Sequence, residues 1–366
     1  MDDLRALGRL LAADSELRVI ADDVAAQRRV WDLAVQHWLH LCLAWRVAGE
    51  AGASWADSVR RDARAMLAEA AVLEELQRRE LCAVISALTG AWIPALLLKG
   101  AAWVYQVYPM PMLRSREDTD LLINAADRDR VAQVLLARGY EPAAENTAEL
   151  ATAQRHYRRM DVQQFLHPID VHWRVTNPLV FADALPFARV WPRSVPIAAL
   201  GGAPALCLVD ALLLACLHRL AHHGDDSNLI WVYDIHWLAT RLTADEWKDL
   251  VEQAAANGLS GVCRQGLSRS MDVFGTIVPT DILSSLAACV AGADAAFLHA
   301  RVGPLRMLAS DWRTMGSWRG RMRLLGAHVF PEREYMASKY GTKSPLLLPL
   351  LYAHRALTGL PRWLRQ

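Results

Sequence analysis

The sequence lacks the features that mark several classes of protein. Forty basic side chains balance 39 acidic ones, so no surplus of positive charge marks a surface for nucleic acid or another acidic polymer. No charge-free apolar run of about 18 residues appears, and the N-terminus has neither the basic start nor the apolar stretch of a secretion signal. We therefore expect a soluble, cytoplasmic protein with no transmembrane segment and no specific nucleic-acid partner.

The cysteines also lack the spacing of a disulfide framework or a zinc site. No C-x-x-C pair occurs, and most of the thiols fall within helical apolar patterns, where cysteine behaves as a small hydrophobic residue. The six are Cys42, Cys82, Cys207, Cys216, Cys263 and Cys289. What the chain has in quantity is alanine and leucine in periodic segments, together with 14 tryptophans. This composition favours a densely packed, helix-rich protein.

Changes of pattern along the chain predict four stretches. Residues 1–90 have a helical period throughout, and residues 91–185 have the pattern of a small α/β core. Residues 186–204 are rich in proline and glycine, which predicts a linker or an irregular crossing, and residues 205–366 predict a C-terminal helical domain. The expected fold class is α+β and predominantly helical, with a small mixed β-sheet flanked by the two helical regions.

The predicted core has the order strand, helix, strand, helix, strand, which is typical of a small α/β unit. Residues 95–98 form a short apolar run of the buried-strand type and end at Lys99-Gly100. The later segments are a helix over 101–108, a strand over 118–123, a helix from a cap at 124–127 to Gly139, and an extended segment over 165–175.

Two aspartates, Asp118 and Asp120, occupy alternate positions of the second predicted strand. Successive side chains of a strand point to opposite faces, so these two share a face, with their α-carbons roughly 6.5 to 7 Å apart. Two ionised carboxylates this close repel each other unless a cation lies between them. A pair of magnesium ions about 3.5 to 4 Å apart is the usual arrangement for in-line displacement at phosphorus, and Asp170 is the best candidate for a third carboxylate.

Three residues around the aspartates suit the binding of phosphate. Lys99-Gly100 ends the first strand and opens a helix, where glycine allows close approach of the backbone, the helix N-terminus favours an anion, and lysine adds a charge. Arg114, four residues before Asp118, can make a bidentate contact to phosphate or to a carboxylate.

In this order, the motifs LLLKG, YP, LRSREDTDLLI and IDVHWRV resemble the uncharacterised bacterial nucleotidyltransferase family of the polymerase-β-like superfamily. In that family a Lys-Gly turn replaces the more usual Gly-Gly or Gly-Ser turn, and a later Asp-x-His-Trp supplies the third carboxylate. His218, His222, Trp231 and Asp234 match a helical H-x-x-x-H and W-x-x-D pattern that members carry. The resemblance covers residues 80–245.

The resemblance implies magnesium-dependent transfer of a nucleoside monophosphate from a nucleoside triphosphate to an acceptor that the sequence does not specify. It implies that Asp118 and Asp120 hold two Mg²⁺ ions, with Mn²⁺ as an alternative, and that Asp170 holds the catalytic ion and helps to deprotonate the acceptor. The residues implied to bind nucleotide are Lys99, Gly100, Arg114, His172, His218, His222 and Asp234. One departure from the family is Arg116-Glu117, where relatives more often have small or apolar residues; both side chains are expected to be solvated.

Several histidine and tryptophan roles stay open at this stage. His172 shares a strand face with Asp170 and has two readings, contact with substrate or a hydrogen bond behind the metal ligands. His218 and His222 either line the cleft or pair with Asp234, and a zinc site is disfavoured because no H-E-x-x-H motif is present. Trp31, Trp38 and Trp45 recur every seven positions, which favours a stripe for helix packing.

Two other functions compete with nucleotidyl transfer. A relative of the same fold can act as a non-catalytic module that binds a nucleotide or a partner, but such relatives usually lose one carboxylate, and all three remain here. The same site can also move another phosphorus-linked group. The prediction is an enzyme of the nucleotidyltransferase type.

Overall fold

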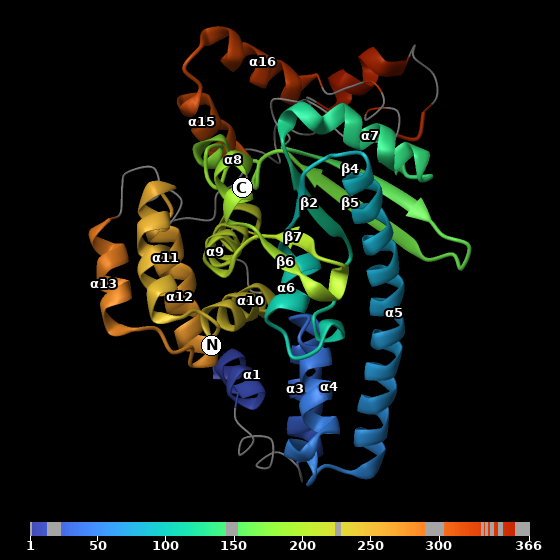
Figure 1. Ribbon diagram of the computed structural model, residues 1–366, viewed down its shortest axis with the longest axis vertical. Coiled ribbons are helices and arrows are strands. Elements are labelled where there is room, and N and C mark those ends of the chain that lie inside the picture. Colours follow the sequence, from blue (N-terminus) through green and yellow to red (C-terminus); the bar gives the residue numbers. More distant parts are fainter. Residues whose placement is uncertain are drawn as a thin grey trace.

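Helices dominate this computed structural model, and a single mixed sheet lies among them (Figure 1). The residues described are 2–12, 23–143, 153–223, 228–289, 304–330, 333, 336, 340–342 and 347–355. This architecture confirms the expected α+β, predominantly helical class with a mixed sheet. The division of the chain into four domains stays a prediction.

The N-terminal helices lie below and beside the sheet in Figure 1, where the long helix α5 runs along one side of it. Their bounds are α1 Asp2–Ala12, α3 Val24–Gln36, α4 His40–Ala48 and α5 Asp57–Gly90. Within the core, α6 (Lys99–Gln106) follows the first strand, and α7 (Arg128–Ala137) follows the second. Both core helices agree with the segments expected from the sequence, and α5 ends at the glycine that precedes the core.

The sheet has seven strands in the order β3-β4-β5-β2-β1-β7-β6. Their bounds are β1 Ala95–Leu97, β2 Thr119–Ile123, β3 Glu141–Pro142, β4 Gln154–Met160, β5 Leu166–His172, β6 Val195–Ile197 and β7 Ala203–Ala205. Strand β2 pairs with β5 in parallel and with β1 in antiparallel fashion, so the central strands carry both kinds of ladder.

The sheet is larger than the three predicted strands. Residues 186–204, predicted as a linker or an irregular crossing, contain α8 (Phe187–Val190), strand β6 and the first residues of β7, which pairs with β1. Pro196 is tolerated because β6 lies at the edge of the sheet. Strand β4 was also unexpected: its sequence QRHYRRM is almost entirely polar, with Tyr157 alone buried.

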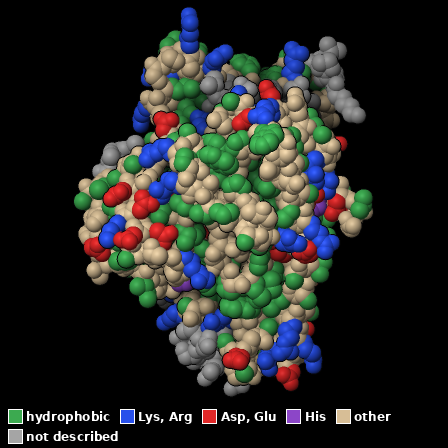
Figure 2. All heavy atoms as spheres, viewed as in Figure 1, with side chains coloured by type: hydrophobic (Ala, Val, Ile, Leu, Met, Phe, Trp, Pro, Cys, Tyr) green, Lys and Arg blue, Asp and Glu red, His purple; other side chains and the backbone are tan. Residues whose placement is uncertain are grey.

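Most helices of the C-terminal half gather on the other side of the sheet from α5, and the last two lie at the top of the view (Figure 1). Their bounds are α9 Leu208–His223, α10 Leu229–Ala239, α11 Ala244–Ala256, α12 Ser260–Phe274, α13 Thr280–Ala288, α15 Pro304–Thr314 and α16 Trp318–Val329. On the face seen in Figure 2, basic and acidic side chains are interspersed, as the near-neutral composition predicts. None of the helices in the described ranges combines the length and the apolar character that a membrane crossing requires.

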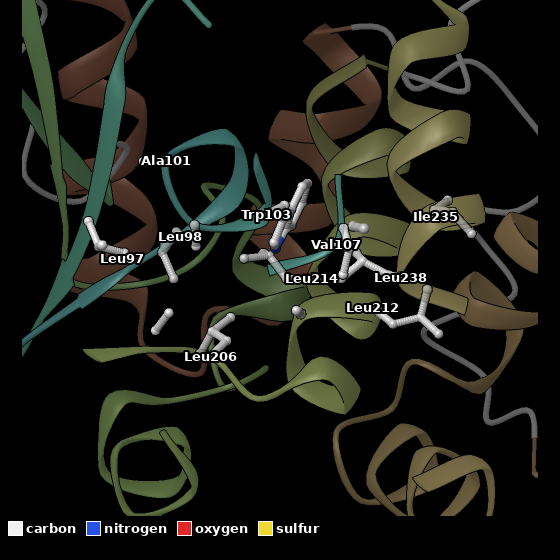
Figure 3. Close-up of a cluster of buried hydrophobic side chains, with 14 of the residues drawn as sticks. Leu97, Leu98, Ala101, Trp103, Val107, Leu206, Leu212, Leu214, Ile235 and Leu238 are labelled. Carbon is white, nitrogen blue, oxygen red and sulfur yellow. The ribbon is translucent and has the colours of Figure 1, made fainter. Parts of the chain in front are cut away.

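The core joins the start of the α/β unit to the C-terminal helices (Figure 3). Leu97 and Leu98 at the end of β1 are fully buried, and Figure 3 places them in one cluster with Trp103 of α6, Leu214 of α9 and Ile235 of α10. Full burial of such a side chain contributes roughly 1.5 to 3 kcal/mol each. The helix that begins at Lys99 and the helix that carries Asp234 are therefore fixed to the same packed cluster.

Candidate active site

The predicted carboxylates converge on one face of the sheet. Asp120 lies in β2 and is the register partner of Asp170 in the parallel strand β5, and partners in a parallel ladder point to the same face. One ligand atom each of Asp120, Asp170 and His172 lies within 4.8 Å of the others. Asp118 precedes β2 and lines the same cleft. Asp170 is therefore beside Asp120, and Asp118 borders the same cleft.

The electrostatics of the two neighbouring aspartates differ sharply. Burial raises the pKa of Asp118 to about 7, helped by the charges of Asp120 and Asp170 and opposed by Lys99 and Arg114. Burial also acts to raise the pKa of Asp120, but Lys99 and His172 outweigh it and hold that pKa well below its ordinary value. Asp120 thus stays ionised, with the charge of Lys99 and a hydrogen bond from His172 stabilising it, while Asp118 is a carboxyl group whose ionised form would be stabilised by an added positive charge.

The raised pKa of Asp118 predicts a pH dependence of stability in metal-free protein. Between about pH 4 and pH 7 the folded state keeps a proton on Asp118 that the unfolded chain has lost, so the free energy of unfolding falls as pH rises through this window. Asp118→Asn removes the effect. We expect the difference in melting temperature, wild type minus Asp118→Asn, to decrease between pH 4.5 and pH 7.5 when both are measured in the presence of a metal chelator. A difference that is constant with pH would contradict the raised pKa.

Lys99 holds Asp120 from a strained backbone position. Its Nζ lies 2.7 Å from Oδ1 of Asp120, and both side chains are buried. The residue has a φ of 47°, in the left-handed region that favours glycine. Strain of this kind is retained in proteins where the surrounding structure requires it, and it clusters at functional sites. Lys99 therefore occupies a backbone position in which glycine would be unstrained.

This geometry predicts an unusual order of stability for two variants at one position. Lys99→Gly and Lys99→Ala both delete the ammonium group, but alanine keeps left-handed strain of roughly 1 to 2 kcal/mol, which exceeds the roughly 0.5 to 1 kcal/mol entropic disadvantage of glycine. We expect the glycine variant to unfold at the higher urea concentration, with a free energy of unfolding about 1 kcal/mol above that of the alanine variant. An alanine variant as stable as the glycine variant would show that the turn is not strained.

His172 approaches the same oxygen of Asp120 from β5. Its Nε2 lies 2.7 Å from Oδ1 of Asp120, and the ring is 1% exposed. Burial lowers the pKa of His172, as does Lys99, while Asp120 opposes the shift. The neutral ring with Nε2–H donates to the carboxylate, and its buried Nδ1 has no hydrogen-bond partner among the residues that the structure describes. His172 thus lies behind Asp120, in the second of the two positions expected for it.

Gly100 and Arg114 touch at the turn. A Cβ on Gly100 would lie 2.3 Å from Nη1 of Arg114, so only glycine permits this approach. The guanidinium makes a bidentate pair with Asp234 of α10, with Nε 2.7 Å from Oδ1 and Nη2 2.8 Å from Oδ2. Tyr108 Oη donates to the same carboxylate at 2.7 Å. Of the two partners expected for Arg114, phosphate or carboxylate, the structure contains the carboxylate.

The site residues surround a cleft with a volume of about 330 Å³, within the range of small-molecule sites. The lining residues are Trp38, Lys99, Gly100, Arg114, Ser115, Arg116, Glu117, Asp118, Asp120, Gln154, Asp170, His218, Asn228, Ile230 and Trp231. Six of the predicted residues from the α/β core therefore meet in one cleft, joined by His218 of α9.

Three predicted residues are placed differently. Asp234 is completely buried and binds Arg114 and Tyr108, so it lies behind the cleft wall instead of facing nucleotide. His172 likewise lies behind Asp120. His222 belongs to α9, but its side chain lies outside the described part of the structure.

Arg116 was expected to be solvated and is instead 8% exposed. Its Nη2 and Nε lie 2.9 and 3.2 Å from the carboxylate of Glu74 on α5, and its carbonyl oxygen accepts from Gln77 of α5 at 3.1 Å. A second carboxylate of α5, Glu80, accepts from Tyr140 at 2.9 Å and from Arg159 of β4 at 2.6 Å. Arg116 thus fixes the segment before β2 to the long helix α5. Glu117 is exposed, as expected.

Sequence reasoning missed His156 and two tryptophans. His156 of β4 is the register partner of Asp170 across the antiparallel ladder, and its Nδ1 hydrogen-bonds Oδ1 of Asp170. The sequence did not predict a role for His156 because β4 is polar and was not recognised as a strand. Trp38 lies between α3 and α4, and Trp231 lies in α10; both line the cleft. The seven-residue spacing had assigned Trp38 to helix packing only.

Comparison with known families agrees with this site. No curated protein matches the chain. A family model described as an uncharacterised nucleotidyltransferase matches residues 23–275, more than half of the chain and more than the span expected from the motifs, since it includes α3, α4 and α5. All the predicted site residues fall within it. The chain belongs to this nucleotidyltransferase family, and it is an enzyme that transfers phosphorus-containing groups.

Proposed function

We propose that the enzyme transfers a nucleoside monophosphate from a nucleoside triphosphate to an acceptor, with release of pyrophosphate. The observation that carries the proposal is the register pairing of Asp120 with Asp170, next to Asp118. Convergent carboxylates serve reactions at phosphorus because cations must be held against the phosphate oxygens. The acceptor is a peptide, a protein, a saccharide or a small metabolite.

The residues present fit magnesium. Asp118, Asp120 and Asp170 supply the oxygen donors that hard divalent cations prefer, and the raised pKa of Asp118 supports a demand for positive charge at this point. His172 fits less well as a ligand, since its Nε2 already faces Asp120. Two Mg²⁺ ions, with Mn²⁺ as the alternative, would neutralise the triphosphate and stabilise the attacking and leaving oxygens.

Lys99, Gly100 and Arg114 form the proposed triphosphate end of the cleft. Arg114 has five N–H donors, of which two bind Asp234 and one makes a long contact of 3.4 Å to the Ser115 carbonyl. The remaining donors include one on Nη1, the atom next to Gly100. A phosphate at the turn would therefore meet both a guanidinium edge and the ammonium group of Lys99.

Asp170 and His156 form the proposed acceptor end. The hydrogen bond from His156 fixes the orientation of the Asp170 carboxylate. In the proposed reaction Asp170 takes the proton of the acceptor, the acceptor atom forms a bond to the α-phosphorus, and the bond from that phosphorus to the bridging oxygen breaks to release pyrophosphate.

The proposal is tested by incubating the full chain with each nucleoside triphosphate, Mg²⁺ and a cell extract. We expect pyrophosphate release that depends on extract, together with a product heavier by one nucleoside monophosphate in mass spectrometry. A product heavier by a phosphoryl or sugar phosphate group would assign the site to the alternative transfer. Binding of nucleotide without any product would favour the non-catalytic module. The cytoplasm is the proposed location because these donors are available there.

A further inference from the structure

Two tryptophans form part of the cleft wall without a role in holding metal or phosphate. Trp38 lies at the junction of α3 and α4, and Trp231 lies in the first turns of α10. Both side chains are half-buried and line the same cleft as the three carboxylates. The elements that carry them belong to opposite ends of the chain, so the cleft is completed by helices outside the α/β core.

Trp231 is tied to the triphosphate end through Asp234. The two residues are three apart in α10, so their side chains lie on the same face of the helix. Asp234 binds Arg114 through both carboxylate oxygens, which fixes this face of α10 against the Arg114 segment. His218 of α9 packs edge-on against the Trp231 ring, with a centroid separation of 6.3 Å and an interplanar angle of 90°.

Trp38 is tied to the same segment from the other direction. Cys42 of α4, four residues after Trp38, donates from Sγ to the carbonyl oxygen of Leu113 at 3.3 Å, and Leu113 directly precedes Arg114. A residue close in sequence to each indole is thus bonded to the segment of Leu113 and Arg114. The opposite end of the cleft, next to Asp170, is supplied by β4 through Gln154.

We infer that Trp38 and Trp231 hold the nucleobase of the donor nucleotide by stacking. The inference rests on the proposed function and adds the subsite for the base. A nucleoside triphosphate whose phosphates lie at Lys99 and Arg114 carries its one flat aromatic group at a short distance from them, and the cleft offers indole rings there. Stacking uses the π-face that every base has, so it holds the base without reading its edge.

The backbone at Trp38 makes a clean test possible. Trp38 has a φ of 61° and follows the last turn of α3, with its N–H bonded to Val35 and the next N–H, of Leu39, bonded to Ala34. This is a Schellman end, in which the left-handed position usually belongs to glycine. Trp38→Gly therefore deletes the indole and also relieves strain at the helix end, and this relief offsets part of the packing that the half-buried ring makes with the core.

The chain offers a matched control for this substitution. Trp92 has a φ of 56° and ends α5 with the same pair of bonds, from Trp92 to Thr89 and from Ile93 to Leu88. Its side chain is 87% exposed and is not part of the cleft. Trp92→Gly makes the same chemical change in the same motif, outside the proposed base site.

The experiment measures binding of Mg·ATP and of Mg·tripolyphosphate to the full-length protein by calorimetry. Wild type, Trp38→Gly, Trp231→Ala and Trp92→Gly are compared, with melting temperatures as a check of folding. Loss of one stacking partner is expected to weaken ATP binding about 5- to 100-fold. Tripolyphosphate has no base, so its affinity is expected to stay within about twofold of wild type in all variants. Trp92→Gly is expected to bind both ligands as wild type does.

Equal losses of ATP and tripolyphosphate affinity in Trp38→Gly and Trp231→Ala would overturn the inference, because the rings would then shape the phosphate site. Unchanged ATP binding in both variants would also overturn it. Equal affinities of wild type for tripolyphosphate and ATP would show that the protein has no subsite for the base. The phosphate site of the proposed function would still be supported by that result. Failure of wild type to bind either ligand would instead remove the proposed function itself.

Discussion

We expect Asp118→Asn, Asp120→Asn and Asp170→Asn each to abolish the proposed nucleotidyl transfer and to leave the protein folded. Asparagine keeps the shape of each side chain but removes the charge that holds a divalent cation. Even residues that only support metal ligands contribute about 10- to 100-fold to affinity or activity, so loss of a ligand is expected to reduce the rate by more than about 100-fold. Pyrophosphate release at saturating Mg²⁺ measures the effect.

Asp118→Asn is the variant of the three that is expected to change activity with the least effect on stability. Its carboxylate is destabilised by burial and by its acidic neighbours, so the neutral side chain does not weaken the fold at pH 7. Asp120→Asn, by contrast, removes the charge that pairs with Lys99 and His172 and is expected to lower the melting temperature as well. The control is Asp129→Asn, at an exposed position of α7, with activity as in wild type. Undiminished activity in Asp118→Asn and Asp120→Asn would refute the metal site.

Asp234→Ala produces the largest loss of stability, about 3 to 5 kcal/mol, because it leaves a buried arginine without its counter-charge. Arg114 is 9% exposed and Asp234 is fully buried, so water replaces little of the lost bidentate pair. Tyr108 loses its acceptor in the same variant. Urea unfolding measures the loss, and Lys248→Ala, which breaks an exposed pair with Asp245 on α11, is the control with little change.

A second comparison separates the charge from the contacts at this position. Asp234→Asn keeps an oxygen that accepts from Tyr108 and Arg114, so its stability is expected to lie between wild type and Asp234→Ala. The alanine variant is also expected to lose nucleotide affinity, since Arg114 is then free to leave the turn at Gly100. An alanine variant as stable as wild type would mean that the pair has no structural role.

The sequence predicted that the carboxylates share a face because the signals for this are local. Asp118 and Asp120 alternate next to a short apolar strand, and Asp170 lies in another, so the spacing alone places their side chains on a face. The register of β2 with β5 then brought Asp120 level with Asp170. Residues of this kind are found from pattern because strand geometry fixes where their side chains point.

The parts that the sequence did not predict depend on contacts between distant segments. Arg114 and Asp234 are 120 positions apart, and neither residue type carries a signal of its partner. Strand β4 is polar and has Tyr157 as its one buried residue, so the apolar alternation of a strand is weak. His156 was missed with it. Strands β6 and β7 were concealed by Pro196 of the edge strand β6 and its register partner Pro204 of β7.

The two buried carboxylates of α5 set a lower limit on the size of an active fragment. A shortened chain that began at β1 would keep every metal-binding carboxylate, yet it would bury Arg116 without Glu74 and leave Tyr140 and Arg159 without Glu80. An unpaired guanidinium beside the first residues of β2 would pull that strand out of line with β5. A minimal catalytic unit is therefore expected to begin upstream of Glu74, although no residue of α5 lines the cleft that contains Asp120 and Asp170.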